Sequence, residues 1–98
     1  HMSITVSLHT QTETTVTVAI HKKVYLYRDL QHITNMFRQS YNIDVISSSW
    51  SVAHKCLLIT MPAEQYTILK LHLGDFSEFE NDYYTYAAVA MEVKCSVQ

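Results

Sequence analysis

The sequence predicts an α+β domain in which two helices cover one face of an antiparallel or mixed sheet. Two observations support this prediction. Apolar and polar residues alternate in several short segments, and in two other segments apolar residues recur at spacings of three and four. The first pattern is typical of half-buried strands and the second of amphipathic helices. The predicted element order is ββαββαβ.

The first two strands form a predicted hairpin. Apolar and polar residues alternate over 3–9 and again over 15–21, and the polar segment 11–14 between them suits a turn. The segment 22–26, which follows, either extends the second strand or leads into a helix.

A helix is predicted over 29–41, where four apolar side chains share one face. Asp29 is a suitable N-cap because its carboxylate can accept from the free amides of the first turn. Asn42 is a suitable left-handed stop. The residues of the shared face are Leu30, Ile33, Phe37 and Tyr41.

Two more strands are predicted over 43–50 and 53–60, with a turn near 50–52 that lacks Asn-Gly or Asp-Gly chemistry. Pro62 then marks the start of a second helix, because proline is tolerated in the first turn. Gly74, the only glycine, stands where that helix would end.

The last segment, 83–97, is predicted as a strand. Its odd-numbered positions from Val89 to Val97 are apolar, whereas its even-numbered positions change from tyrosine and alanine to polar residues. Its tyrosine and valine content favours a strand over a helix through the alanines. The order from the second strand onward resembles a ferredoxin-like domain with an extra N-terminal strand. A β-grasp arrangement is the alternative. We favour the first because the second helix has about three turns by its spacing.

Length and composition predict one domain covering residues 3–98, with His1 and Met2 set aside as resembling the remnant of a cloning tag. Hydrophobic residues make up 48% and charged residues 16%, which predicts a packed core rather than disorder. The net charge of −2 gives no long-range attraction for nucleic acid or anionic membranes. No apolar run approaches the length of a membrane span, so we expect no membrane association.

Two cysteines, Cys56 and Cys95, lie in apolar runs and are expected to be buried thiols of a cytoplasmic, reducing compartment. A disulfide between them is the alternative. His54 and Cys56 share a strand face, but metal sites usually contain two close ligand pairs, so we expect no metal site. With one glycine and no catalytic motif, we expect neither a cofactor nor an enzyme.

The segment 75–82 holds four of the nine acidic residues and two phenylalanines, which suits contact with a basic, partly apolar partner. An alternative reading is a solvated loop whose phenylalanines enter the core. The predicted partner-binding residues are Phe76, Glu78, Phe79, Glu80, Tyr83 and Tyr84.

A second set of residues suits nucleic acid, in which tyrosines would stack on bases beside lysines. This set comprises Lys22, Lys23, Tyr25 and Tyr27. We rank it below protein binding because these lysines are the only adjacent basic pair among 7 basic residues.

The sequence therefore predicts a non-catalytic protein-binding module with an unidentified protein partner. A small viral or phage inhibitor, an immunity-type protein and an assembly subunit all fit this description. We also favour a homodimer slightly over a monomer. The dimer would form by pairing of the final or the N-terminal strand across a two-fold axis.

Overall fold

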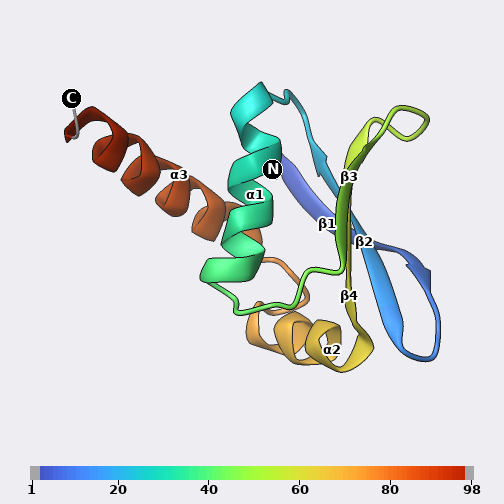
Figure 1. The fold of residues 1–98 in the computed structure, drawn as a ribbon. Coiled ribbons are helices and arrows are strands. Elements are labelled where there is room, and N and C mark those ends of the chain that lie inside the picture. The colour runs from blue at the N-terminus through green and yellow to red at the C-terminus, as the bar shows by residue number, and fades with distance from the viewer. Residues whose placement is uncertain (1–2, 97–98) are drawn as a thin grey trace.

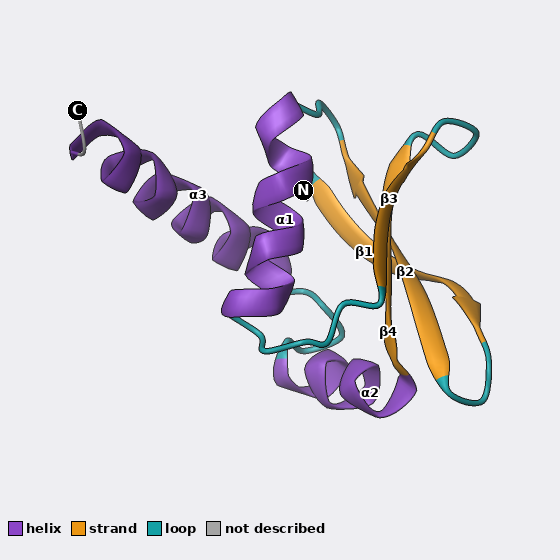
Figure 2. Ribbon diagram, in the orientation of Figure 1, coloured by secondary structure: helices purple, strands orange, loops and turns teal. Residues whose placement is uncertain are grey.

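The computed structural model describes residues 3–96 of the chain, and side chains to residue 92. The protein is an α+β domain with a four-stranded antiparallel sheet and three helices, as Figures 1 and 2 show. Along the chain the elements are β1 (Ile4–Gln11), β2 (Thr15–Lys22), α1 (Tyr27–Gln39), β3 (Ser47–Ser51), β4 (Cys56–Pro62), α2 (Ala63–His72) and α3 (Phe79–Ser96).

The sheet has the strand order β1-β2-β4-β3, so β1 and β3 are its edges. β2 and β4 pair at its centre, with Val18 opposite Ile59. In Figure 2, α1 lies along one face of the sheet and α2 lies at the end where β4 stops. α3 leads away from the rest of the molecule.

The core lies between the sheet and the helices. It combines the inward-facing residues of the central strands with one face of each helix, which is the expected arrangement for a two-layer domain. Its main members are Val18, Ile20, Leu57 and Ile59 from the sheet, Ile33 and Phe37 from α1, Leu69 from α2, and Phe79 and Tyr83 from α3.

The prediction of a final strand over 83–97 is wrong, because the described residues of this segment belong to helix α3. The buried residues Phe79 and Tyr83, with the partly buried Tyr86 and Ala87, follow the helical spacing i, i+4, i+7 and i+8. The predicted strand began after Phe79 and thus concealed this pattern. Ferredoxin-like and β-grasp arrangements both need a last strand in the sheet, and the described sheet has none. Dimerisation through that strand loses its basis, whereas pairing through the N-terminal strand stays a prediction.

The other elements agree more closely with the sequence. The first hairpin is confirmed, and the segment 22–26 leads into a helix. Asn42 and Gly74 both have a φ of 56°, as predicted for residues that follow a helix. α1 begins two residues before the predicted start. Leu26 is its N-cap, and Asp29 accepts from the Leu26 amide at 2.6 Å.

Candidate functional site

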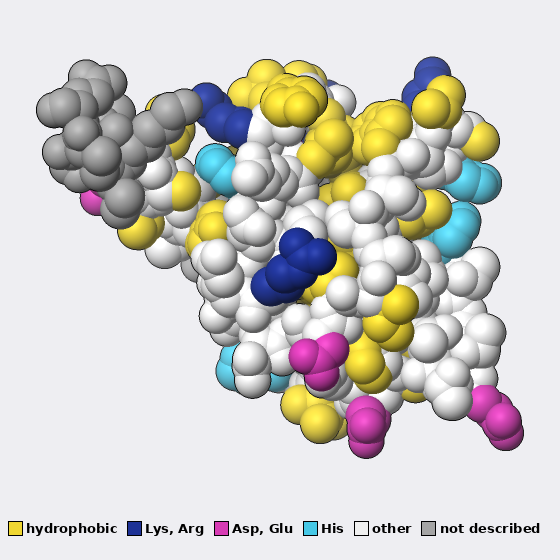
Figure 3. Space-filling model, viewed as in Figure 1, with side chains coloured by type: hydrophobic (Ala, Val, Ile, Leu, Met, Phe, Trp, Pro, Cys, Tyr) yellow, Lys and Arg dark blue, Asp and Glu magenta, His cyan; other side chains and the backbone are white. Residues whose placement is uncertain are grey.

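One surface hollow among the described residues lies between helix α1 and the edge strand β3. We call it the edge groove, and its volume is about 430 Å³. In Figure 3, apolar side chains lie between helix and strand in this region. The groove is lined by Leu30, Gln31, Thr34, Asn35 and Arg38 of α1, by Ser48, Ser49 and Trp50 of β3, and by Leu57 of β4.

One pair of hydroxyl groups fixes α1 to the edge strand. The Oγ atoms of Thr34 and Ser48 are 2.7 Å apart, and Thr34 also donates to the Leu30 carbonyl at 2.9 Å. Because a hydroxyl group has a single hydrogen, Ser48 must then donate to Thr34. Thr34 is buried and Ser48 is exposed, and both residues line the groove, so this bond joins its two sides.

The end of the groove at the start of α1 carries aromatic and exposed apolar side chains. The rings of Tyr25 and Trp50 meet edge to face with centroids 4.9 Å apart, and the Tyr25 hydroxyl donates to the Ile20 carbonyl. Tyr27 is 93% exposed and Val52 is 81% exposed. We call this surface the aromatic end, and it comprises Val24, Tyr25, Leu26, Tyr27, Trp50 and Val52. Figure 3 shows apolar side chains gathered there, over the start of α1 and the top of β3.

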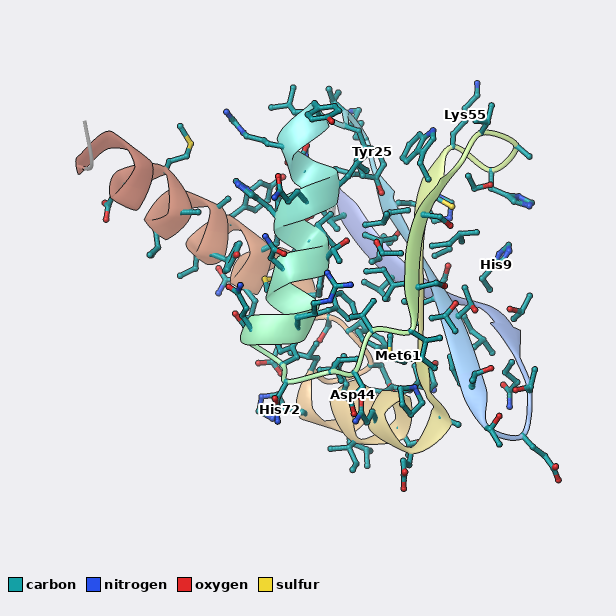
Figure 4. All side chains as sticks on the ribbon, viewed as in Figure 1. His9, Tyr25, Asp44, Lys55, Met61 and His72 are labelled. Carbon is teal, nitrogen blue, oxygen red and sulfur yellow. The ribbon has the colours of Figure 1, made fainter. Side chains whose placement is uncertain are left out.

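Charge is distributed unevenly between the two ends of the molecule. Lys23, Arg28 and Lys55 are exposed and flank the aromatic end in the chain. Figure 4 places Lys55 at the tip of the β3–β4 turn, at the same end of the molecule as Tyr25, whereas Asp44 lies at the opposite end of β3. The aromatic end thus offers basic and apolar groups together.

Asp29, in the first turn of α1, is a buried carboxylate whose hydrogen-bonding capacity is already used. Asp29 accepts from the Tyr83 hydroxyl and the Leu26 amide, and Lys22 Nζ lies 3.2 Å from its Oδ2 atom. Burial alone would raise the pKa of Asp29, but these three donors overcome burial and lower it below 3.8. Asp29 therefore stays ionised, joins β2, α1 and α3, and adds no free negative charge to the surface.

Two titratable groups near the groove, Tyr25 and Cys56, keep their protons at neutral pH. Burial raises the pKa of Tyr25 to about 12, so its hydroxyl stays protonated. Burial also raises the pKa of Cys56, which is a free and buried thiol. A neutral thiol is a weak nucleophile.

The predicted partner-binding residues do not form one exposed surface. Phe76 and Phe79 are buried, as the alternative reading of that segment expected, and Tyr83 is buried as well. Glu80 accepts from the Ile4 amide at 2.7 Å, and hydrogen bonds with the backbone there lower its pKa. Glu80 thus fastens the start of β1.

The remaining two members of this set are accessible. Tyr84 is 48% exposed, and its hydroxyl lies 2.9 Å from the Ser3 Oγ atom. Glu78 is exposed. A binding role for these two residues stays a prediction.

The predicted nucleic-acid residues are divided in the same way. Lys22 pairs with Asp29, and Tyr25 packs against Trp50. Lys23 and Tyr27 are exposed, so only these two are available to a ligand.

The possible metal ligands are spread apart. Among the residues that the structure describes, no three His, Cys, Asp or Glu side chains lie close enough to hold a metal ion. His54 instead meets the ring of His9 edge to face at 5.0 Å. The side chain of Cys95 lies outside the described residues, so its predicted state is not addressed.

No family model, curated protein or solved structure matches the chain. No helix in the described part is long and apolar enough to cross a membrane. A function for the groove therefore has to be inferred from the geometry and chemistry of the groove itself. Tyr25 and Tyr27 were predicted from the sequence only as nucleic-acid residues, and Trp50 was not predicted as a site residue. The available signal for Trp50 was a single large aromatic residue within a run of serines.

Proposed function

We propose that this domain is a non-catalytic protein-binding module and that it binds its partner through the aromatic end and the adjoining edge groove. The observation that carries the proposal is the contact between the rings of Tyr25 and Trp50, which brings the segment 24–27 beside the end of β3. The neighbouring apolar side chains of these two segments are exposed, namely Val24, Leu26, Tyr27 and Val52. Tyrosine, tryptophan and arginine are enriched among residues that dominate binding energy at protein interfaces.

The exposure of these side chains has no structural explanation within the domain. Val24 is 64% exposed, and Leu26 is also largely exposed, although both belong to a connection that could have carried polar residues. Exposed apolar side chains that cluster, rather than occur singly, are typical of an interaction site. The basic neighbours Lys23, Arg28 and Lys55 favour a partner surface that is acidic around an apolar centre.

The test is capture of a partner from lysate of the source cells, with nuclease added, by four immobilised forms of the domain. The forms are the wild type, Tyr27→Ser with Val52→Ser, Ile68→Ser with Leu71→Ser, and Arg28→Gln. Ile68 and Leu71 are exposed apolar residues of α2 and make a matched control, since both double variants replace two exposed large side chains by serine. All forms should keep the circular dichroism spectrum of the wild type.

We expect one stoichiometric protein that binds the wild type and the α2 control but is lost from the Tyr27→Ser, Val52→Ser form. Equal loss from both double variants would indicate non-specific adhesion and contradict the proposal. Capture that disappears with nuclease would favour the nucleic-acid reading, for which the exposed Lys23 and Tyr27 are the available residues. Binding would then fall steeply with salt concentration.

A further inference from the structure

β3 is an edge strand with little protection against pairing with another chain. An edge strand directs alternate backbone amides and carbonyls away from its sheet, and proteins usually shield such edges with charges, prolines or bulges. β3 has the sequence Ser-Ser-Ser-Trp-Ser, with no charge, proline or register shift, and its shortness is its only protection.

The other edge of the sheet is shielded. The pairing of β1 with β2 shifts between Leu8 and Thr10, which is a bulge, and Glu80 holds the start of β1 through the Ile4 amide. The two edges therefore differ in their capacity to accept a further strand.

The edge groove supplies side-chain positions alongside this open edge. Tyr25, just before α1, contacts Trp50 near the end of β3, whereas Thr34 contacts Ser48 further back along the strand. α1 therefore runs antiparallel to β3. A chain added antiparallel to β3 would run from the aromatic end toward the end of α1 that carries Arg38.

Arg38 is the only charged residue in the lining of the groove. It is exposed, and among the residues whose side chains the structure describes it forms no ion pair. A guanidinium group binds a carboxylate through two parallel hydrogen bonds. The groove thus has an apolar position at Trp50 and Leu30 and a carboxylate position at Arg38.

The spacing of these positions fits an extended chain. Leu30 and Arg38 are eight residues apart on α1, which places them about 12 Å apart along the helix axis. An extended chain covers that distance in about four residues, and residues i and i+4 of a strand project from the same face. An apolar side chain and a carboxylate four residues later would therefore both reach the groove.

We infer that the edge groove binds an extended peptide segment of a partner protein, added antiparallel to β3, with an apolar side chain beside Trp50 and a carboxylate four residues later on Arg38. This inference rests on the proposed protein-binding function and specifies the chemistry of the partner. Main-chain pairing supplies affinity in this mode of recognition, and the alternating side chains supply specificity.

The experiment is selection from a library of linear eight-residue peptides displayed on phage, with the whole domain as target. Selected peptides are then synthesised, and their affinities for the wild type, Arg38→Gln and Lys70→Gln are measured by fluorescence anisotropy. Lys70 is an exposed basic residue of α2 outside the groove lining, which makes it the matched control. Amide hydrogen exchange follows residues 47–51 with and without peptide.

We expect an enriched pattern of an apolar residue followed four positions later by an acidic one. Arg38→Gln should weaken binding by about tenfold, since a hydrogen-bonded ion pair is lost, and Lys70→Gln should leave it unchanged. Bound peptide should slow exchange of the β3 amides.

Several results would overturn the inference: no enriched peptide, an enriched pattern without the acidic position, equal binding to Arg38→Gln, or unprotected β3 amides. Slowing of β3 exchange with rising protein concentration, in the absence of peptide, would assign the edge to a second copy of the chain instead. Each of these results is compatible with partner capture through Tyr27 and Val52, so failure here is distinguishable from failure of the proposed function.

Discussion

Replacement of Tyr83 by phenylalanine tests the buried hydrogen-bonding centre that joins β2, α1 and α3. Tyr83 is 2% exposed, and its hydroxyl donates to the Oδ1 atom of Asp29, which is itself 4% exposed. The substitution removes one oxygen and leaves a buried, ionised carboxylate without one of its donors. A hydrogen bond to a charged group contributes roughly 1.5–3 kcal/mol, so we expect the free energy of unfolding to fall by about 2 kcal/mol. For a domain of this size, the midpoint of thermal unfolding would fall by about 10 °C.

The pH dependence of this loss provides a second, independent check. The donors around Asp29 lower its pKa in the folded protein below 3.8, the ordinary value. A lowered carboxyl pKa stabilises the fold above the unfolded value, and this stabilisation is lost as pH falls through the folded value. Tyr83→Phe removes one of the donors, so its cost should be full at about pH 7 and smaller at an acidic pH below the lowered pKa of Asp29, where that carboxyl takes up a proton.

Urea unfolding followed by circular dichroism at both pH values measures this cost, with Tyr84→Phe as the matched control. Tyr84 is 48% exposed and its hydroxyl contacts only Ser3 Oγ among the described residues, so its loss should cost less than about 0.5 kcal/mol. The reasoning would be refuted by equal costs for the two variants at neutral pH, or by a cost for Tyr83→Phe that does not depend on pH.

Two further substitutions test the turn between α2 and α3 and the hydrogen bond that holds the start of β1. Gly74→Ala places a Cβ atom 3.1 Å from Ser77 Oγ at a φ of +56°, so we expect the free energy of unfolding measured in urea to fall by about 1–2 kcal/mol. Unchanged stability would mean that the turn accommodates the added atom without strain. Glu80→Gln retains the shape of the side chain but weakens its acceptance from the Ile4 amide, so hydrogen exchange at the start of β1 should accelerate while β2 and β4 stay protected. Uniform acceleration over all strands would instead show that Glu80 stabilises the whole fold.

Local chemistry made much of the fold predictable from sequence. The alternation in β1 and β2, the left-handed Asn42 and Gly74, and the start of α2 after Pro62 all depend on neighbours within a few residues. Features of this kind can be predicted from the local sequence, because they do not depend on contacts with distant parts of the chain.

The last helix could not be predicted in this way because two patterns compete in its sequence. Valines and tyrosines give it strand character, whereas its repeated alanines and Met91 favour a helix. Burial of Phe79 and Tyr83 against α1 and the sheet decides between them, and this contact depends on the folded arrangement. Phe79 is therefore a core residue, and Phe76 packs against the ring of Tyr66. Of the acidic residues beside them, Asp75 and Glu78 remain exposed, whereas Glu80 and Asp82 are partly buried.

The edge groove was hidden for a different reason, since it joins residues whose proximity depends on strand order. Nonetheless, the sequence contains a usable signal. A strand at the centre of a sheet must be apolar on its covered face, as β4 is with Leu57, Ile59 and Met61. β3 has serine on both faces, and a strand of that composition is stable only at an edge, where it buries little. A tryptophan within such a strand cannot enter the core fully, so it remains available for contacts outside the domain. The serines of β3 and the exposure of Trp50 thus have one physical cause, and it is the same property that leaves this edge open to a partner strand.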